Sequence, residues 1–364
     1  MSDPGRATEV ARYAASDLDA FVRTALTELG MAAADAALCS EILLDADLRG
    51  VGTHGIANFA WHLHYGPGLR DGYVNPRPSI EVLRDAPVAA AWDADRGFGP
   101  LVAHRAMSAA IDKARDTGIG MITVRNGCHF GAHAYFVDLA AAHDMIAMSM
   151  THTGPVAVAP GGLDRVMGTN PLGIGVPSAD DHNFVLDMST TAISGTKALF
   201  AARAGTALPW GVAVDETGRI TTDPDARSQG GLLPLGSTLD TGAAKGLGLG
   251  LVVDMLSGLL SGTGSGLHQH YSPEWCQGYW FLAWRVDLFS DVDEFREQVA
   301  EVTRTVRSSR RVDPATPVRV PGDRGAEARR WQREHGVELL ADVVARCEEF
   351  AADIGVPFPR PLRT

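Results

Sequence analysis

The stretch Ala46-Asp-Leu-Arg-Gly-Val-Gly-Thr-His-Gly55 ends an apolar helical pattern with a loop that carries Asp47, Arg49, Thr53 and His54. Its three glycines allow positive φ angles and the close approach of a ligand. His54 is then placed to carry a proton, because an imidazole titrates near neutral pH. The alternative is a histidine that hydrogen bonds satisfy within a turn, so this loop by itself leaves both interpretations open.

Further short motifs follow this loop in a fixed order. They are Asn126-Gly-Cys-His-Phe-Gly131, Met167-Gly-Thr-Asn-Pro-Leu-Gly-Ile-Gly-Val-Pro177, Val185-Leu-Asp-Met-Ser-Thr-Thr191, Leu232-Leu-Pro-Leu-Gly236, Ala244-Lys-Gly-Leu-Gly-Leu249 and Val320-Pro-Gly-Asp323. The ordered set resembles the malate/L-lactate dehydrogenase family, which is distinct from the Rossmann-type lactate and malate dehydrogenases. The resemblance covers nearly the whole chain and implies an oxidoreductase that uses NAD or NADP.

The resemblance also implies an α/β fold of non-Rossmann type. A mixed, largely antiparallel sheet would form the nucleotide-binding domain, and both chain ends would form a helical domain. We expect residues 1–76 with 300–364 in the helical domain, which carries the His54 loop, and residues 77–299 in the cofactor-binding and substrate domain. A Rossmann phosphate loop at 246–250 is rejected, because these glycines follow a loop and fall inside a helical stretch, where close packing is their expected use.

Periodicity gives a coarse order of elements. Apolar residues three and four apart predict helices at both ends of the chain, at 16–29, 32–46, 292–307 and 326–354. Ser16 is the expected N-cap of the first helix. Between them, buried strands at 88–92, 120–124, 146–151 and 184–188 alternate with helices at 101–116 and 132–143.

Composition excludes several classes of function. The net charge of −12 argues against a nucleic-acid partner, because phosphate backbones require clustered positive charge. No apolar run is long enough for a membrane span, and residues 1–6 lack the pattern of a secretory signal, so we expect a cytoplasmic protein. The four cysteines have no metal-type spacing and are expected to be reduced.

His129 is the second candidate catalytic residue. It lies between the strand ending at Val124 and the helix expected near Ala132, where the positive end of a helix would keep the ring neutral. In the resembled family the histidine of the His-Phe-Gly motif lines the active site, and that role is carried to His129. A histidine that merely caps a helix entry is the alternative.

Asp187 ends an apolar strand, where a carboxylate can orient an imidazole and stabilise its charged form. A structural cap for the turn that follows is the alternative. The resemblance implies that this segment approaches the cofactor. Cofactor contacts are therefore expected from Thr153, Asp187, Met188, Ser189, Pro321, Gly322 and Asp323.

Lys245 is noteworthy because the chain has 29 arginines but only three lysines. It interrupts a run of glycine and alanine, where a lone cation favours an anion such as the cofactor phosphate. The family lysine at this position supports that interpretation. A solvated lysine at a helix start is the alternative.

Two features bear on the substrate. Residues Gly168, Thr169 and Asn170 form a turn that either anchors a ligand or is purely structural. The family usually has an arginine at the position of Asn58, and an amide cannot supply its charge to a carboxylate. Another arginine, such as Arg49, would then hold the carboxylate, or the substrate differs from a simple 2-keto or 2-hydroxy acid; Thr53, Trp61 and Tyr65 lie nearby in the sequence.

Twelve histidines raise the question of a metal, but His62 with His64 and His268 with His270 have no carboxylate or cysteine at ligand spacing. We expect these to be surface or loop histidines and no metal site. The sequence favours hydride transfer to or from a keto acid, a related carbonyl or a cyclic imine, with His54 as proton carrier. A redox-neutral isomerase, dehydratase or lyase on the same fold is the alternative. The resemblance implies a homodimer.

Overall fold

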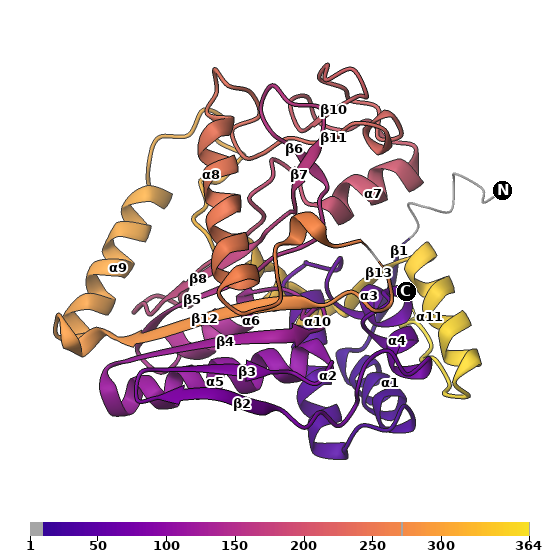
Figure 1. Cartoon of the computed structure of the whole chain (residues 1–364), viewed down its shortest axis with the longest axis horizontal. Helices are drawn as coiled ribbons and strands as arrows, with labels where there is room; N and C mark the ends of the chain where they lie inside the picture. Colours follow the sequence, from indigo (N-terminus) through magenta and orange to yellow (C-terminus); the bar gives the residue numbers. More distant parts are fainter. Residues whose placement is uncertain (1–9, 271, 364) are drawn as a thin grey trace.

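A seven-stranded sheet forms the centre of the computed structural model, which describes residues 10–270 and 272–363 (Figure 1). The N-terminal residues 1–6, discussed above for targeting, lie outside the described residues. The strand order is β2 (Glu81–Ala86), β3 (Ala89–Asp93), β4 (Ile119–Gly127), β12 (Gln277–Arg285), β5 (Met145–Thr151), β8 (Leu172–Val176) and β9 (Phe184–Met188). Only β3 and β4 pair in parallel, and the other neighbours are antiparallel. The expected mixed, largely antiparallel sheet is confirmed.

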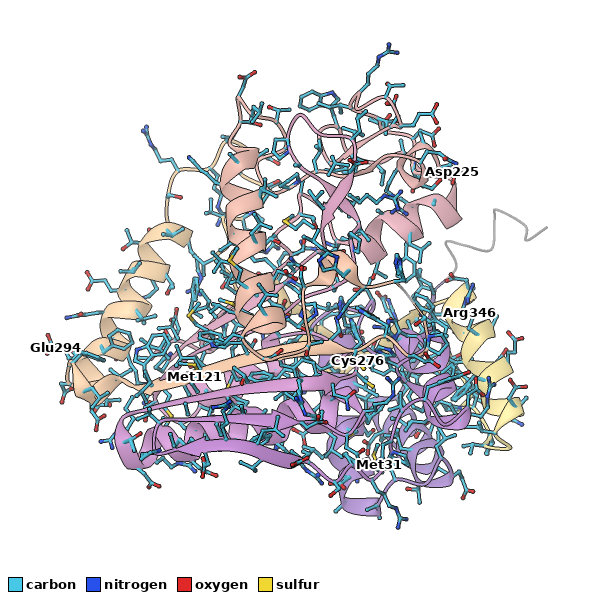
Figure 2. All side chains as sticks on the ribbon, viewed as in Figure 1. Met31, Met121, Asp225, Cys276, Glu294 and Arg346 are labelled. Carbon is cyan, nitrogen blue, oxygen red and sulfur yellow. The ribbon has the colours of Figure 1, made fainter. Side chains whose placement is uncertain are left out.

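Alternate side chains of the central strand β12 enter two different cores. Tyr279 and Phe281 pack with the helices α5 (Gly99–Thr117) and α6 (Ala134–Ala141) on one face. Trp280 packs on the other face with α8 (Ala243–Asp254), which continues into the π-helical turn η3 (Met255–Leu259). Because a strand alternates its side chains, an apolar run here supports two helical layers (Figure 2).

Both chain ends share one hydrophobic core beside this sheet. It contains α1 (Ala15–Glu28), α2 (Ala33–Leu48), α3 (Ile56–Trp61), α4 (Gly66–Arg70) and α11 (Ala341–Asp353). Strand β1 (Val10–Tyr13) pairs with β13 (Val337–Leu340) and ties the two ends together. Helix α10 (Asp323–His335) packs on α2.

The expected domain boundary at residue 300 falls inside helix α9 (Val292–Arg307). This helix lies on the far side of the molecule from α11 in Figure 1, and its Arg307 pairs with Asp180 near the sheet. A boundary placed in the loop before α10 would leave α9 whole.

A second, smaller sheet lies above the large one in Figure 1. It has the order β10 (Ala213–Val214), β11 (Gly231–Leu232), β6 (Ala157–Val158) and β7 (Arg165–Met167). Helix α7 (Gly195–Ala204) packs beside it, and short 3-10 turns are η2 (Ala226–Ser228), η4 (Gly266–His268) and η5 (Val286–Leu288). The cleft between this sheet and the helical unit positions the candidate site.

The structure corrects three expectations about elements. The helix expected over 326–354 is α10, β13 and α11, because Gly336, at φ +95, ends α10 and the chain then pairs with β1. The first helix begins at Ala15 after an N-cap at Ala14, so Ser16 is not its cap. Strands β2 and β12 were not predicted, although β12 lies in the middle of the sheet.

The glycines at 246 and 250 do lie inside a helix, as expected. A Cβ at Gly246 would come within 2.2 Å of the Leu235 carbonyl oxygen, and one at Gly250 within 2.1 Å of the Met167 sulfur. Their use in close packing is confirmed. In the part of the chain that the structure describes, no helix combines the length and apolar character needed to cross a bilayer.

Candidate active site

A cavity of about 1990 Å³ opens where the helical unit, the large sheet and the small sheet meet. This exceeds the roughly 300–1,000 Å³ of a pocket for one drug-sized ligand, so two ligands can lie in it together. Eleven of the sixteen candidate catalytic, cofactor and substrate residues line it: Arg49, Thr53, His54, His129, Thr153, Thr169, Asp187, Met188, Ser189, Pro321 and Gly322.

Asp47 of helix α2 holds the loop that carries His54. One oxygen of its carboxylate accepts a hydrogen bond from the Ile56 amide at 2.8 Å, and burial raises the pKa of Asp47 to about 7. A Cβ at Gly55 would lie 2.2 Å from this carboxylate, so Gly55 is needed for space. Of the three loop glycines, only Gly50 has a positive φ, at +72.

The His54 ring is held on two sides. Its Nδ1 lies 2.9 Å from the Thr53 hydroxyl oxygen, and its ring stacks on that of His129 with centroids 5.7 Å apart. Burial lowers the pKa of His54 to about 4, so the imidazole is neutral at pH 7. Since Nδ1 is engaged by Thr53, Nε2 is the atom suited to exchange a proton with a ligand.

Three histidines behind His54 are linked through their backbones. The Gly131 amide donates to Nδ1 of His129 at 3.3 Å, the His129 amide to Nδ1 of His64 at 3.0 Å, and the His64 amide to Nδ1 of His62 at 3.1 Å. An amide N–H only donates, so each neutral ring carries its proton on Nε2. His62 and His64 lie in the loop between α3 and α4, as one of the two expected settings, but they are buried rather than at the surface.

Asn58 is buried and acts on His129 through Tyr65. The Asn58 side chain hydrogen-bonds the Tyr65 hydroxyl, which donates to Nδ1 of His129 at 2.8 Å. Asn58 itself does not line the cavity, so its contacts give it a role in orienting His129, and a direct contact with substrate stays a prediction. Sequence reasoning missed the orienting role, because the Tyr65 hydroxyl reaches His129 across 64 positions of the chain.

Burial keeps this group of imidazoles uncharged. It lowers the pKa of His62 to about 3, that of His64 to about 4 and that of His129 well below its usual value, and neighbouring imidazoles add to the effect in His62 and His129. The ring of His129 is therefore neutral as expected, but chiefly for another reason. Helix α6 begins only at Ala134, so desolvation rather than the helix end is the main cause.

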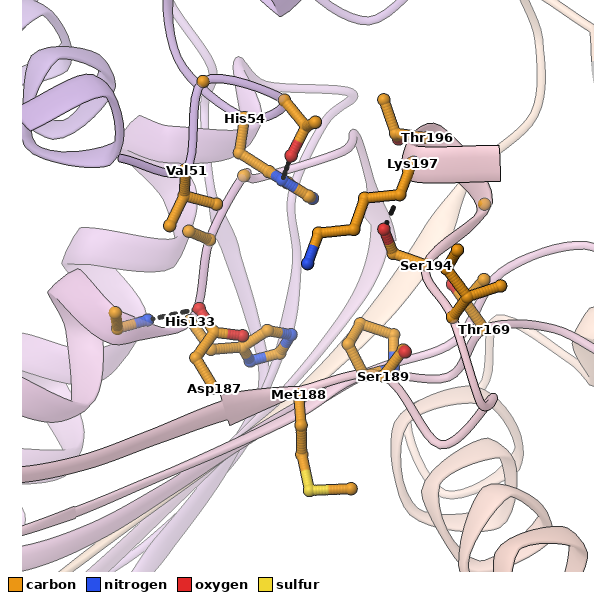
Figure 3. A pocket seen from close by; sticks show the side chains of 18 of the residues that line it. Val51, His54, His133, Thr169, Asp187, Met188, Ser189, Ser194, Thr196 and Lys197 are labelled. Carbon is orange, nitrogen blue, oxygen red and sulfur yellow. Dashed lines mark hydrogen bonds between the residues drawn. The ribbon is translucent and has the colours of Figure 1, made fainter. Parts of the chain in front are cut away.

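Asp187 caps helix α6 from the end of β9. One carboxylate oxygen accepts from the Ala134 amide at 3.0 Å (Figure 3). Burial raises the pKa of Asp187 to about 6. Hydrogen bonds from the backbone amides of Ala134 and His133 and the charge of Arg49 limit this rise. Asp187 is expected from the sequence to orient a catalytic imidazole. In the structure its carboxylate instead contacts the backbone amide of Ala134, the residue after His133.

Lys197, not Lys245, brings a cation to the cavity. Lys197 lies in the first turn of α7 and extends toward the space between His54 and Asp187 (Figure 3), and it forms no ion pair within 4.0 Å with any described residue. Lys245 is exposed on α8 and is not among the lining residues. The contact of Lys245 with a cofactor phosphate therefore stays a prediction, and Lys197 is a second candidate for it.

Arg49 is already engaged by protein carboxylates. Its guanidinium pairs with Asp45 at 2.7 Å and with Asp138 at 2.6 Å, and its side chain is 8% exposed. Breaking a buried ion pair to bind a ligand would leave uncompensated charges. The expectation that Arg49 holds a substrate carboxylate is therefore not supported by its contacts.

Residues 13–348 match the family model described as malate/L-lactate dehydrogenase. The chain belongs to the malate/L-lactate dehydrogenase family.

Relatives with known names match this chain over almost its whole length. The chain is 34% identical over 349 residues to the malate dehydrogenase of Pyrococcus abyssi, and the match covers 95% of each chain. The structure of malate dehydrogenase from Pyrococcus horikoshii OT3 is similar with a TM-score of 0.87, 32% identity, and 96% and 97% of the two chains covered. The delta1-piperideine-2-carboxylate reductase from Pseudomonas syringae has a TM-score of 0.81 at 26% identity, with 93% and 99% covered.

In this family member, several expected ligand contacts are structural. Asn170 takes a hydrogen bond from the Thr153 amide at 3.1 Å and donates to the Gly250 carbonyl at 2.8 Å. A Cβ at Gly168 would lie 2.3 Å from the Thr153 carbonyl oxygen. Neither Gly168 nor Asn170 lines the cavity, whereas Thr169 does, so the turn places Thr153 and Thr169 at its wall.

Asp323 also lies outside the cavity lining. It pairs with Arg307 at 2.8 Å and with His182 at 3.1 Å, and it accepts from the Val320 amide at 2.9 Å. These contacts satisfy its carboxylate and shape the start of α10, and the contact of Asp323 with the cofactor stays a prediction. Among residues 10–270 and 272–363, no group of three or more side chains could hold a metal ion.

Proposed function

We propose that this dehydrogenase uses NAD or NADP to move a hydride between nicotinamide C4 and a carbonyl carbon of a 2-keto or 2-hydroxy acid, or the carbon of a cyclic imine. One observation carries the proposal: two stacked, neutral imidazoles, His54 and His129, at the wall of a cavity with room for two ligands. The names of the relatives, a malate dehydrogenase and a piperideine-carboxylate reductase, support both substrate types.

The residues of the wall suit a nicotinamide cofactor. Lys197 offers a positive charge to a phosphate or a ribose hydroxyl. His133 and Gln277 present buried polar atoms without a hydrogen-bond partner in the described part of the chain, which is the condition for a ligand to complete their bonding. When bound, the nicotinamide would supply or accept the hydride.

His54 would move the proton that accompanies hydride transfer. In the direction of oxidation, its neutral Nε2 takes the proton of the substrate hydroxyl while Thr53 holds Nδ1. His129 presents Nε2–H to the substrate oxygen, and Tyr65 and the Gly131 amide hold its orientation from behind. The imidazoles therefore give one acceptor and one donor at neighbouring positions.

Arg49 and Asn58 are both engaged by other residues of the protein. Arg49 is engaged by two aspartates and Asn58 by Tyr65, so neither offers charge to a carboxylate. Lys197, Arg227 and Arg324 line the cavity without an ion pair within 4.0 Å to any described residue, so they remain to bind the cofactor phosphates and a substrate carboxylate. The named relatives are dehydrogenases or reductases and give no support to the redox-neutral alternative.

Titration of the protein with NADH and NADPH tests the proposal. Trp61 and Trp275 line the cavity, so quenching of tryptophan fluorescence reports binding directly. We expect micromolar binding of one nucleotide, followed by oxidation of that nucleotide when keto acids and cyclic imino acids are screened with it. Failure of both nucleotides to bind would contradict hydride transfer and direct the search to redox-neutral chemistry at His54.

We also propose a cytoplasmic homodimer with no nucleic-acid or membrane partner. Exposed apolar side chains lie along α8 and η3, at Val252, Met255, Leu259 and Leu260, and apolar clusters of this kind mark protein interfaces. Sedimentation equilibrium should give twice the chain mass of 38.6 kDa, and Met255→Glu should lower it toward that of one chain. A wild-type protein that sediments as a monomer at micromolar concentration would contradict the dimer.

A further inference from the structure

The ring of His133 presents a buried atom to the cavity that no part of the described structure satisfies. The residue is 1% exposed and lines the cavity at the N-cap of α6. Its Nδ1 lies 2.6 Å from the Ser149 hydroxyl oxygen, while its Nε2 has no hydrogen-bond partner among the described residues. A buried polar atom left without a partner destabilises the protein, so a ligand that bonds it gains from the contact.

The fold makes room for this imidazole. A Cβ at Gly173 on β8 would lie 2.5 Å from the Cβ of His133 and 3.0 Å from the Ser149 hydroxyl oxygen. Any other residue at 173 would displace the histidine or its partner. The imidazole of His133, at the start of α6, therefore fits between Ser149 on β5 and Gly173 on β8.

The contacts of the ring define which proton it carries. The main-chain carbonyl of Ser149 also hydrogen-bonds the ring. Since a carbonyl can only accept, and Nε2 is unpartnered, the proton lies on Nδ1. Burial lowers the pKa of His133 to about 3, so the ring is neutral at pH 7 and Nε2 presents a lone pair.

A second acceptor lies beside His133. Asp187, in register with Gly173 across the sheet, takes hydrogen bonds from the backbone amides of His133 and Ala134 at the helix start. Figure 3 shows the two side chains next to each other below His54 and Lys197. Two acceptors on one patch of wall match a group with two N–H bonds, such as a primary amide.

We propose that Nε2 of His133 accepts a hydrogen bond from the carboxamide NH2 group of the nicotinamide, beside the Asp187 carboxylate. This inference rests on the proposed function. The carboxamide is attached to the ring carbon next to C4, and its NH2 is the only hydrogen-bond donor on the nicotinamide. His54 and His133 line the same cavity, so the proposed proton carrier and this acceptor face the same ligand space.

Three oxidised cofactors distinguish this contact in the wild-type protein. They are the parent dinucleotide that binds, its thionicotinamide analogue, which keeps the NH2 group, and its 3-acetylpyridine analogue, which replaces NH2 by methyl. We expect the acetyl analogue to bind about tenfold more weakly than the parent, which is the effect of one lost buried hydrogen bond. The thionicotinamide analogue should bind within about twofold of the parent. Tryptophan quenching gives each Kd without any turnover.

Variants assign the effect to His133. His133→Ala should weaken the parent about tenfold and leave the acetyl analogue unchanged, so that the two bind alike. His104→Ala is the matched control, because His104 also has a buried, unpartnered ring nitrogen but lies outside the cavity lining. Should His133→Ala fail to fold by circular dichroism, His133→Asn, whose side chain cannot reach the Nε2 position, makes the same comparison.

Equal binding of the parent and the acetyl analogue to the wild type would overturn the inference. So would a His133 variant that weakens both cofactors equally, since the loss would then not involve the NH2 group. Binding of neither NAD nor NADP to the wild type is a different result, because it contradicts the proposed function itself.

Discussion

At the scale of single residues, the chemistry of the site depends on which ring nitrogen of each histidine the protein already engages. Thr53 engages Nδ1 of His54, and backbone amides engage Nδ1 of His129, His64 and His62. The amide donors fix the tautomers of His129, His64 and His62 without adding charge, and the Thr53 hydroxyl occupies Nδ1 of His54. The His54 loop was recognisable from the sequence, whereas the linked histidines were not, because the bond from His129 to His64 spans 65 positions.

The pH profile of substrate oxidation should report the depressed pKa of His54. Burial lowers this pKa to about 4, and a base is active in its neutral form, so kcat/KM should stay level from pH 8 to about pH 5 and fall near pH 4. His54→Gln should lower kcat by about 10²–10⁴-fold, with the cofactor Kd within about twofold.

Asp187→Asn is the control for that profile, since Asp187 has a raised pKa of about 6 in the same cavity. The acidic limb should keep its position in this variant. A limb centred near 6.5 in the wild type, the ordinary value for histidine, would show that His54 is not the buried base we describe.

The two lysines make a matched pair for cofactor binding. Lys197→Ala should weaken binding of NADH or NADPH about tenfold, because it removes the cation that extends between His54 and Asp187. Lys245→Ala should change Kd less than twofold, because Lys245 is exposed outside the cavity lining. Fluorescence titration of both variants checks this, and the reverse order would restore Lys245 as the cofactor contact.

At the scale of elements, the unit of α2, the His54 loop and α3 acts as one rigid support. Asp47 bonds the first amide of α3, and Gly55 is packed against its carboxylate. The sequence indicated a glycine-rich loop, but it could not show that Gly55 is required for contact with a residue eight positions earlier.

Gly55→Ala and Gly52→Ala separate these two uses of glycine. At Gly55 an added Cβ would overlap Asp47, so we expect a loss of about 1–3 kcal/mol in unfolding free energy and a fall in kcat as His54 shifts. At Gly52 the nearest atom would be 3.7 Å away and φ is not in the left-handed region, so stability and kcat should stay near the wild-type values.

Urea unfolding and initial rates measure both variants. Equal effects of the two substitutions would mean that loop flexibility, rather than the Asp47 contact, is what the glycines supply.

Local patterns predicted many elements and failed where pairing is remote. The helix over 292–307 was predicted with its observed bounds, since its apolar spacing is helical by itself. Strand β12 was missed although it lies at the sheet centre, because its partners β4 and β5 are more than 120 residues earlier. Strand β13 was taken for helix, because its partner β1 lies at the other end of the chain.

At the scale of the whole molecule, the buried histidines make stability depend on pH. Burial lowers the pKa of seven of them below the value of 6.5 in the unfolded chain, with large shifts in six, His54, His62, His64, His129, His133 and His152, and a smaller shift in His104. Between these values the unfolded state binds more protons, so stability present above pH 6.5 is lost as the pH falls. Asp47 and Asp187 have raised pKa values and act in the opposite direction, but they are two against the six with large shifts.

We therefore expect the unfolding free energy to fall by on the order of 5 kcal/mol from pH 7 to pH 5. Urea midpoints at the two pH values measure it. The double variant His62→Gln, His64→Gln should lose about a third of this pH difference, because it removes two of the six groups with large shifts. A midpoint that rises on acidification would mean that the aspartates dominate.

The sequence by itself determined the family, the mixed antiparallel fold class and the choice of His54, His129 and Asp187 as cavity residues. Those features depend on ordered motifs and local periodicity, which are present in the chain before it folds. The tertiary structure alone decided that Lys197 rather than Lys245 reaches the cavity, that Arg49 is engaged by Asp45 and Asp138, and that His133 presents an unsatisfied nitrogen. Charge, partners and burial are properties of a place in space, and residues far apart in the chain define that place only once they have packed together.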